Sequence, residues 1–593
     1  MIRLAMGIVC ALCGLGLAGL SFSALSVVGT EKETTTKAFS AGDGAYALVL
    51  DEAIVPFEHT EATLTVTSDQ ELFLGAANGV DVDDYLTGVA HEEITDVDFP
   101  KTAHHRLIAG EPQPEAPAPE RDWWTAEDTG TTVSRSFDLD AEPQVIVVTP
   151  AEPAGTLEGA QVTLSMKVGE VLGMALLGFA GAAAFLGLAA FVFLRMWVSR
   201  FRPRPKRVNG AGPSGVLRRR RAESAGAARR GPGSEAGTDS GNGDGLGDST
   251  RRSRRRGGAA PAGGVSTLRG RSRRSVRALA GLSAGALVLS GCGTDFPQPT
   301  RPELTPYERP ALEPGQAGPF LASYSERLDE ALRGEPEALE AVQTGPLLER
   351  TRAEMLMAEH SDSTLGAASY ADVRAGGPMF ESYPLWFMAF ATPRDEDIDD
   401  AEAMLVTRDS AAGEWTVAQS VFVPQESVPT VLADERGAVE EAPPEHEEAA
   451  ARVVDGAVSY LTDGKAPEGG PDYAAAGFKD FRDYVGGLGA EDTGFEDLEV
   501  ECSPYDGMPL SDYALATEGG GVSFAEVRCQ ITVNVPEDYF VDLGDEIEAV
   551  MTTDDEGSTI RIDISQPMLV TTEGASAEVA SPGWYMLASA TSD

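Results

Sequence analysis

The chain has 593 residues, which is too long for a single domain and predicts three or four folded units. Its formal net charge is −48 at pH 7, with 94 acidic and 46 basic residues. This acidic excess argues against nucleic acid as a partner of the folded domains, because a phosphate backbone has to be neutralised by Lys and Arg. It suits a surface that faces cations, a cationic protein or a charged wall.

The charge is distributed unevenly along the chain. The stretch from Arg195 to Arg277 holds 22 basic and 5 acidic residues, a balance of +17, so the rest of the chain carries −65. Short basic loops remain in the cytoplasm, whereas acidic segments cross a membrane freely. We therefore expect the basic stretch on the cytoplasmic side of a membrane and the acidic stretches on the outer side.

Residues 1–29 are expected to form a transmembrane helix that stays in place as a signal anchor. Every residue from Leu4 to Val28 is apolar or small, and this length spans a hydrocarbon core of about 30 Å. A cleaved signal peptide is the alternative, because Ser and Ala near the end of the segment suit a peptidase. The uninterrupted length favours the anchor.

Residues 171–194 predict a second transmembrane helix, since all 24 residues are uncharged. Arg195 follows directly, and five more basic residues lie between positions 200 and 207. The positive-inside rule therefore places the C-terminal end of this helix in the cytoplasm.

Residues 30–165, between these two helices, predict a small, mostly β domain outside the membrane, arranged as a sandwich. Five segments combine β-branched residues with partial alternation and end in turn residues. They are Tyr46–Leu50, Ala62–Thr67, Leu72–Leu74, Val133–Leu139 and Gln144–Val148. Asp83 or Asp84 is placed to cap a short helix that runs toward Ala90.

Part of this domain resembles a recurrent stretch in uncharacterised actinobacterial membrane proteins. The likeness is carried by Leu72–Gly75, by Val82–Val97, by the pair Trp123-Trp124 and by a final strand at Val145–Val148. It covers roughly residues 40–195. The resemblance implies a location in the cell envelope and brings no known activity with it.

Residues 195–277 form a basic linker of Gly, Ser, Arg and Ala with almost no large apolar residues. Such a segment cannot bury enough apolar surface to offset its conformational entropy, so we expect it to be disordered. Its Arg clusters suit the anionic headgroups of the lipid bilayer. Nucleic-acid binding is not favoured, because no aromatic residues are interleaved for base stacking.

Residues 278–292 form a third apolar segment, which has the features of a lipoprotein signal. Five Arg residues precede it between positions 269 and 277, and the motif Leu289-Ser290-Gly291-Cys292 ends it. Its apolar run is short for a membrane span but suits the core of a signal peptide. The ending resembles the bacterial lipobox, in which a peptidase cuts before a lipid-modified cysteine. The resemblance implies that Cys292 is lipidated.

This signal lies inside the chain, and two interpretations remain. Either the signal is used where it stands and the chain is cut before Cys292, or two neighbouring genes have fused and the segment acts as a third membrane anchor. Both interpretations place residues 293–593 outside the membrane.

Cys502 and Cys529 are the only pair of cysteines in a predicted outside domain. Because that compartment is oxidising, we expect a disulfide between them. Cys10 and Cys13 lie in the first apolar helix, where a small soft residue packs well and a thiolate is disfavoured.

Residues 293–318 predict a Pro-rich tether, and two similar halves follow it. Each half, residues 319–430 and residues 446–593, places helices before a long antiparallel sheet. In the first half, a turn from Asp409 to Gly413 joins two of the predicted strands. This order of elements resembles a tandem of NTF2-like (cystatin-like) α+β domains. The resemblance implies cone-shaped folds with an apolar mouth that is able to take a small ligand.

We assign no catalytic, cofactor-binding or metal-binding residues. Asp81, Asp83, Asp84 and Glu92 have the ends of a calcium loop, but Tyr85 stands where an oxygen ligand is required. A capped helix in an acidic loop explains them better. Neighbouring histidines on an extended chain point to opposite sides, which disfavours a zinc site.

The sequence therefore predicts a cell-membrane protein whose folded domains lie outside the cytoplasm. We expect a non-enzymatic module that uses no cofactor and that binds an envelope protein or a wall polymer, with no nucleic acid as partner. The alternative is an enzyme or a small-ligand-binding protein that uses an NTF2-like pocket with Asp and Tyr as acid–base groups.

Overall fold

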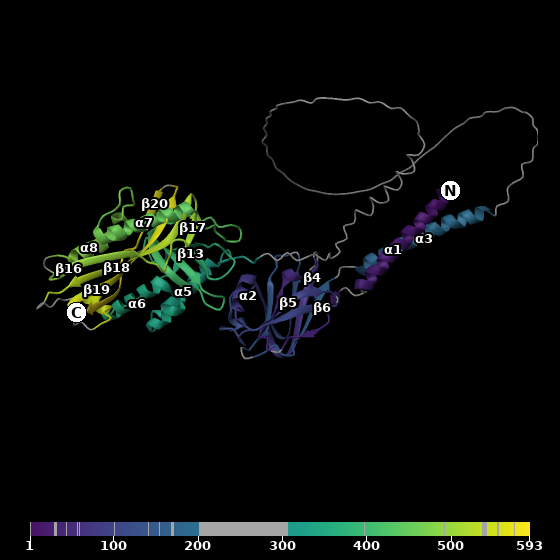
Figure 1. The fold of residues 1–593 in the computed structure, drawn as a ribbon, viewed down its shortest axis with the longest axis horizontal. Helices are drawn as coiled ribbons and strands as arrows, with labels where there is room; N and C mark the ends of the chain where they lie inside the picture. Colours follow the sequence, from purple (N-terminus) through teal and green to yellow (C-terminus); the bar gives the residue numbers. More distant parts are fainter. Residues whose placement is uncertain are drawn as a thin grey trace, which may run out of the picture. The chain divides into compact units, whose positions relative to one another are not determined.

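The computed structural model describes residues 2–200 and 306–592, with gaps at 29–32, 43, 56, 58–59, 100, 140, 153–154, 168–170, 396–397, 491–492, 537–542, 554–556 and 575. Most of the basic linker and the whole third apolar segment lie outside these described residues. In the described part the chain combines helices with strands, and its N-terminal domain is mostly β (Figure 1).

Two helices are long and apolar enough to cross a membrane. They are α1 (Ile2–Val28) and α3 (Val171–Arg200), with candidate spans at Leu4–Phe22 and Leu176–Val198. Small residues of α1 recur every seven positions where it meets α3. A Cβ atom added to Gly14 would lie 2.8 Å from Leu186 Cγ, and one added to Gly178 would lie 2.1 Å from Ser21 Oγ. Small residues of this kind let two helix backbones approach closely.

The N-terminal β domain is built on one hydrogen-bonded sheet. Its main path runs β1-β9-β4-β8-β3-β5-β6, while β2 pairs with β9 and β7 pairs with β4. β3 and β5 are parallel, and the other pairs are antiparallel. The strands are β1 (Glu33–Thr35), β2 (Phe39–Ser40), β3 (Ala47–Asp51), β4 (Glu61–Ala77), β5 (His91–Asp98), β6 (Thr102–Ile108), β7 (Ala126–Asp138), β8 (Val145–Pro150) and β9 (Gln161–Lys167).

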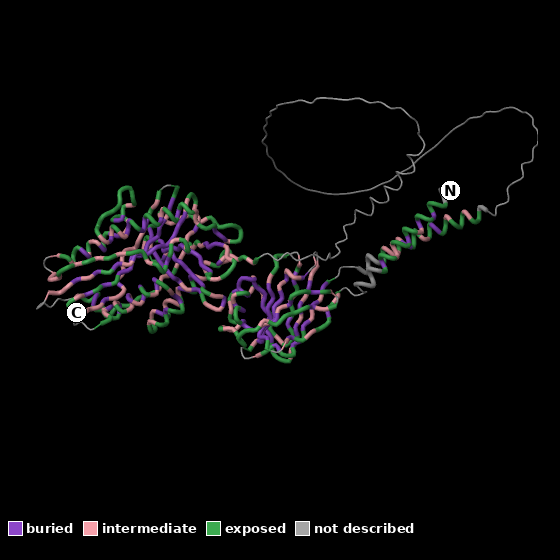
Figure 2. Tube along the Cα trace, in the orientation of Figure 1, coloured by how far each residue is buried: buried purple, intermediate pink, exposed green. Residues whose placement is uncertain are grey.

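The central strands of this sheet are buried on both faces (Figure 2). Side chains alternate along a strand, so Leu48 and Val148 enter one core while Val49 and Val147 enter another. The first core is lined by strands from both ends of the sheet. The second needs a separate cover, which begins with helix α2 (Gly79–Tyr85).

Three details of this domain differ from the sequence-based predictions. The strands form one continuous sheet and not the two sheets of a sandwich, because the long strand β4 pairs with three others. Helix α2 is capped by the Asn78 side chain, whose Oδ1 accepts the Val80 N–H at 2.9 Å, and it ends before Leu86. The two segments predicted around Ser68 join into β4, with a register shift there.

Residues 306–592 contain two larger antiparallel sheets. The first has the order β11-β13-β14-β15, and the second has the order β16-β18-β19-β20 with β17 beside β18 and β21 beside β19. Helix α5 packs against β11 of the first sheet, and α6 packs against β15 of the first sheet and β21 of the second. Helix α7 packs against β16 and β18 of the second sheet (Figure 1). The helices are α5 (Ala317–Ala331), α6 (Gly345–His360), α7 (Pro444–Asp463), α8 (Lys479–Leu488) and α9 (Asp545–Ala549).

Helices α5 and α6 precede the first sheet and helices α7 and α8 precede the second, which is the order that the sequence predicts. The strands are β10 (Arg309–Pro310), β11 (Tyr370–Gly376), β12 (Met379–Phe380), β13 (Leu385–Pro393), β14 (Asp400–Arg408), β15 (Thr416–Pro424), β16 (Glu496–Pro504), β17 (Ala514–Thr517), β18 (Gly520–Asn534), β19 (Thr559–Glu573), β20 (Ser576–Ala580) and β21 (Tyr585–Ser592). The predicted Asp409–Gly413 turn lies between β14 and β15.

The two sheets of residues 306–592 share a hydrophobic core. Along β13, Leu385 and Phe387 pack with α5 and α6, whereas Trp386 and Met388 pack with Phe524 of the second sheet. The continuous apolar run of β13 is therefore buried on both faces. The two predicted halves meet face to face and do not stand apart.

Cys502 and Cys529 form a disulfide, which confirms the predicted pair. The two residues lie opposite each other on β16 and β18. Their separation of 27 positions closes a loop at the edge of the second sheet.

Removing this disulfide is expected to destabilise the second sheet. In the chain-entropy model a loop of this length contributes about 3 kcal/mol to the free energy of unfolding. Cys502→Ser combined with Cys529→Ser should therefore raise hydrogen exchange in β16 and β18 of the full-length protein. Exchange in β13 and β14 serves as the internal control, and unchanged exchange in β16 would contradict the expectation.

His446 is buried between α7 and the second sheet, with 2 % of its surface exposed. Its Nδ1 lies 2.9 Å from Thr572 Oγ1, and its Nε2 lies 3.1 Å from Ser523 Oγ. Burial lowers the pKa of His446 to about 4, because the charged imidazolium is poorly solvated there.

This histidine makes the stability of the second sheet depend on pH. The unfolded chain takes up the proton near the ordinary pKa of about 6.5, whereas the folded chain resists it. The contribution is complete above that pH and is lost as the pH falls toward 4, by up to about 3 kcal/mol. His446→Gln cannot take up a proton, so the protection factor of the amides in α7 should fall less in this variant than in the wild type between pH 6.5 and pH 4.

Candidate functional site

The structure places the N-terminal β domain directly against residues 306–592, and this contact is the best-built site in the described part of the chain. We call it the docking surface. On the β domain it comprises Asp51, Asn78, Gly79, Asp81, Asp84, Arg121, Asp122 and Trp123. On the other side it comprises Tyr307, Glu308, Arg309, Tyr383, Arg408, Ala411 and Ala412.

A buried ion pair lies at the centre of the docking surface. The Arg309 guanidinium contacts both carboxylate oxygens of Asp81, whose side chain is 1 % exposed. The Tyr383 hydroxyl also donates to Asp81 Oδ1 at 2.7 Å. Burial raises the pKa of Asp81, and the Arg309 charge and the Tyr383 hydrogen bond oppose that rise.

Removing one partner of such a pair is costly, because it leaves the other charge buried without compensation. Asp81 is held on helix α2 by the fold of the β domain, whereas Arg309 belongs to the short strand β10. The pair therefore favours one position of β10 over α2.

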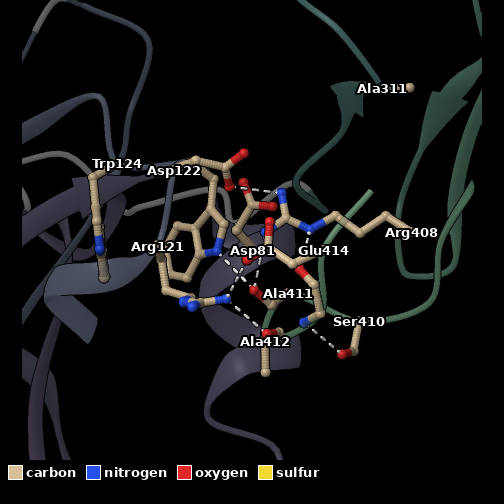
Figure 3. Close-up of polar contacts among 12 residues, drawn as sticks. Asp81, Arg121, Asp122, Trp124, Ala311, Arg408, Ser410, Ala411, Ala412 and Glu414 are labelled. Atoms are coloured by element: carbon tan, nitrogen blue, oxygen red, sulfur yellow. Dashed lines mark hydrogen bonds and ion pairs between the residues drawn. The ribbon is translucent and has the colours of Figure 1, made fainter. Parts of the chain in front are cut away.

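The turn between β14 and β15 is recognised through its backbone (Figure 3). Asp84 Oδ2 accepts the Ala411 N–H at 2.7 Å, and Trp123 Nε1–H donates to the Ala411 carbonyl at 2.9 Å. Arg121 Nη1–H donates to the Ala412 carbonyl at 2.7 Å. Three side chains of the β domain thus satisfy the polar backbone groups of one tight turn, which fixes its position without a large side chain.

Arg408 supports this turn from the other side of the docking surface. Its side chain is 2 % exposed, and its Nη1 lies 2.8 Å from Asp122 Oδ1 of the β domain. Its Nε–H also donates to the Gly413 carbonyl at 2.9 Å, and the guanidinium lies 5.7 Å from the ring centre of Trp415. The Arg408 guanidinium therefore links the turn both to strand β14, on which Arg408 lies, and to the β domain.

Tyr307 packs against a residue that has no side chain. A Cβ atom added to Gly79 would lie 2.1 Å from the Tyr307 ring, so the ring occupies the space that a side chain would need. The Tyr307 hydroxyl donates to Asp51 Oδ1 at 2.5 Å, and Asn78 Nδ2–H donates to the Glu308 carbonyl at 3.0 Å. Burial and the neighbouring Asp51 carboxylate raise the pKa of Tyr307, so the phenol stays protonated as a donor.

Apolar contacts complete the docking surface. The second core of the β sheet includes Trp123 and Tyr85, whose rings meet edge to face at 5.5 Å. Ala411 belongs to the same core and is fully buried, while Tyr307 and Tyr383 pack at its margin. Residues 306–592 therefore supply part of the cover that the second face of the β sheet needs.

A cleft and a cavity lie beside this surface. The cleft, of about 560 Å³, is bordered by Trp124, Phe320 and Trp415. The cavity, of about 820 Å³, lies along α5 and β11 and includes Tyr370. The Tyr370 hydroxyl donates to Glu402 Oε2 at 2.8 Å, and burial raises the pKa of Glu402. Within residues 319–430 this pair resembles the acid–base pair that the sequence analysis leaves open, with Glu in place of Asp, whereas Asp51 and Tyr307 border a separate pocket of about 540 Å³.

The disulfide and lipobox residues that the sequence singles out lie in different parts of the chain, away from the docking surface or outside the described residues. Cys502 and Cys529 line an open groove of about 1000 Å³ together with Arg528. The predicted lipobox, from Leu289 through Ser290 and Gly291 to Cys292, lies outside the described residues.

The acidic residues with the ends of a calcium loop do not converge. Asp81 and Asp84 are engaged by the docking surface, and Glu92 Oε2 accepts the Gly42 N–H at 2.8 Å while its other oxygen meets His105. In the described part of the chain, no group of three His, Cys, Asp or Glu side chains is arranged to hold a metal ion.

Sequence reasoning did not find the docking residues. Residues 306–316 fall in the predicted Pro-rich tether, but Tyr307 and Arg309 are fixed in the contact. An available signal was the charge of Arg309 amid prolines, together with the aromatic pair Trp123-Trp124. Two buried carboxyls, Glu402 and Glu526, were also missed because a lone Glu in a strand usually faces solvent.

A comparison with protein families finds one match for this chain. A family described as a domain of unknown function, DUF8094, matches residues 308–582. The matched region begins within the docking surface and covers both large sheets. No curated protein and no solved structure matches the chain.

The two tryptophans offer a matched test of the docking surface. Trp123 Nε1–H donates to the Ala411 carbonyl, whereas Trp124 Nε1–H donates to Ala118 within the β domain at 2.7 Å. Phe keeps an aromatic ring but cannot donate, so each change removes one hydrogen bond worth about 1 kcal/mol. Trp123→Phe should raise hydrogen exchange in residues 409–415.

Trp124→Phe is the control for that measurement, because its lost bond lies outside the contact. Exchange in residues 409–415 should stay at the wild-type level in this variant. Equal increases in the two variants would show that the turn is not held by Trp123.

Proposed function

We propose that the protein is a non-enzymatic module of the cell envelope that holds its DUF8094-like region at the outer face of the cytoplasmic membrane. The observation that carries this proposal is the docking surface, where the buried Asp81–Arg309 pair attaches that region to the β domain. The β domain lies in the sequence between the two apolar helices, so whatever docks on it stays near the bilayer.

The two apolar helices support retention of the first one as an anchor. The residues of α1 that meet α3 include Gly7, Gly14 and Ser21, which lie seven positions apart. Such spacing keeps one face of a helix against its neighbour along its length. A signal peptide that is removed has no need for a fitted partner helix.

The charge distribution supports the proposed topology. The basic stretch after α3 lies inside, and both acidic folded regions lie outside. The lipobox-like ending at Cys292 then returns the chain to the outer side, either as a lipid-modified N-terminus after cleavage or as a third membrane segment. Bilayer lipid is one partner in either case, and nucleic acid is none.

The same proposal includes the finer fold of residues 319–593. We infer two NTF2-like halves, because each half places helices before an antiparallel sheet. The outer acidic surface suits an envelope protein or a wall polymer that carries positive charge.

The topology is testable with cysteines introduced into full-length protein whose Cys10, Cys13 and Cys292 are replaced by Ala. Lys101→Cys and Glu468→Cys place a thiol on exposed positions of the two folded regions, and Ser240→Cys places one in the basic linker. A membrane-impermeant maleimide should label the first two variants on intact cells and label the third only after permeabilisation. Labelling of the third on intact cells would contradict the proposal.

The binding role needs a second measurement in native membranes. Chemical crosslinking followed by purification of the full-length protein should recover a defined envelope protein or wall polymer. Trp124→Phe protein, in which the lost hydrogen bond lies outside the docking surface, serves as the control for the amount of protein expressed. Recovery of lipid alone would contradict the binding role.

A further inference from the structure

We propose that the docking surface binds residues 306–592 to the β domain without the connecting chain, so that the two parts remain one complex after the chain is cut between them. The partner of the β domain is thus this DUF8094-like region as a separate polypeptide. This inference rests on the proposed outer location of both parts, and it adds that their attachment is non-covalent.

The contacts come from three separate places in residues 306–592. They are the segment Tyr307–Arg309, the single residue Tyr383 and the turn with Arg408 to Ala412. Tyr383 and the turn belong to the folded region and not to the connecting chain. The docking surface therefore has the character of an interface between two folded bodies.

The chemistry of the β domain side indicates a surface made for a partner. Asp81 is a carboxylate with 1 % of its side chain exposed, and its charged partner is supplied by Arg309. Asp84 and Trp123 aim a carboxylate and an indole N–H at one backbone turn of the other part. Gly79 leaves the space that the Tyr307 ring fills.

The partner side is equally specific. Arg408 is 2 % exposed and reaches Asp122 across the contact, while Arg309 reaches the buried Asp81. Two arginines of residues 306–592 therefore meet two aspartates of the β domain. Paired charges of this kind set the orientation of two partners and disfavour others.

In the sequence, the proposed cut before Cys292 lies N-terminal to every residue that residues 306–592 contribute to these contacts. Cys292 and Tyr307 are 15 positions apart, so cleavage before Cys292 leaves the whole partner side on the C-terminal product. A lipid-modified product would then reach the β domain on the same membrane face. Confinement to one surface raises the effective concentration of the two parts.

The test uses full-length protein with a recognition sequence for a specific protease inserted after Gln298. Cutting there separates residues 299–593 from every apolar membrane segment and from Cys292, so the docking surface is left as their attachment to the membrane. The protease is added to protoplasts, the membranes are sedimented, and the C-terminal fragment is measured in pellet and supernatant. We expect the wild-type fragment in the pellet.

Two variants remove the attachment from opposite sides. Gly79→Leu fills the space of the Tyr307 ring at the first turn of α2, where Leu is a good helix former. Arg309→Ala removes the charged partner of Asp81 and changes no residue of the β domain. Each variant should raise the soluble fraction of the fragment at least tenfold over the wild type.

Asp98→Ala is the matched control, since Asp98 forms an exposed ion pair with Lys101 away from the contact. This variant should retain its fragment in the pellet as the wild type does. Release of the wild-type fragment to the level of Gly79→Leu would overturn the inference. Retention in both docking variants would also overturn it, because another contact would then hold the fragment.

The same experiment separates this inference from the proposed location. If the inserted sequence is cut only after the protoplasts are lysed, residues 293–593 are not outside and the proposed function fails. If it is cut on intact protoplasts and the wild-type fragment leaves the membrane, the location holds and the docking inference fails.

Discussion

A carboxylate that is shielded from water needs a positive partner, and Asp81 finds it 228 positions away on Arg309. The desolvation cost of both charges is partly offset by the pair itself and by the Tyr383 hydroxyl. Because neither charge is tolerated alone in that place, the pair fixes where β10 lies on α2. The turn around Ala411 and the Tyr307 ring then meet complementary groups of the β domain.

The apolar part of the contact follows from the sheet of the β domain. The strand Val145–Pro150 has inward residues on both faces, so each face must be covered. One face is closed by the sheet itself, and the other by α2, Trp123 and residues 306–592. Strand β13 is covered in the same way: one face packs against α5 and α6, and the other packs against the second sheet. Strands that are apolar at every position thus connect the parts of this protein.

The two apolar helices use a different kind of contact. In hydrocarbon the burial of apolar surface gives no preference between lipid and protein, so helix association depends on close packing. Gly7 and Gly14 of α1 supply that closeness toward α3. Together with the proposed topology, this helix pair gives the β domain two fixed points at the bilayer, and the docking surface extends that fixation to the DUF8094-like region.

The sequence by itself determined the features that depend on local pattern. The two apolar helices, most strands of the two large sheets, the Asp409–Gly413 turn and the Cys502–Cys529 disulfide all follow from composition, periodicity and spacing. Even the residues of the docking turn were predicted as a turn, although their partner was not.

Only the tertiary structure decided which distant groups meet. The pairing of Asp81 with Arg309, the fit of Tyr307 on Gly79 and the face-to-face packing of the two sheets join positions far apart in the chain. No local pattern encodes such pairs. An Asp in the first turn of a helix, or an Arg among prolines, is just as stable when it faces solvent as when it is buried with a partner. Burial selects among these groups, and burial is a property of the folded chain.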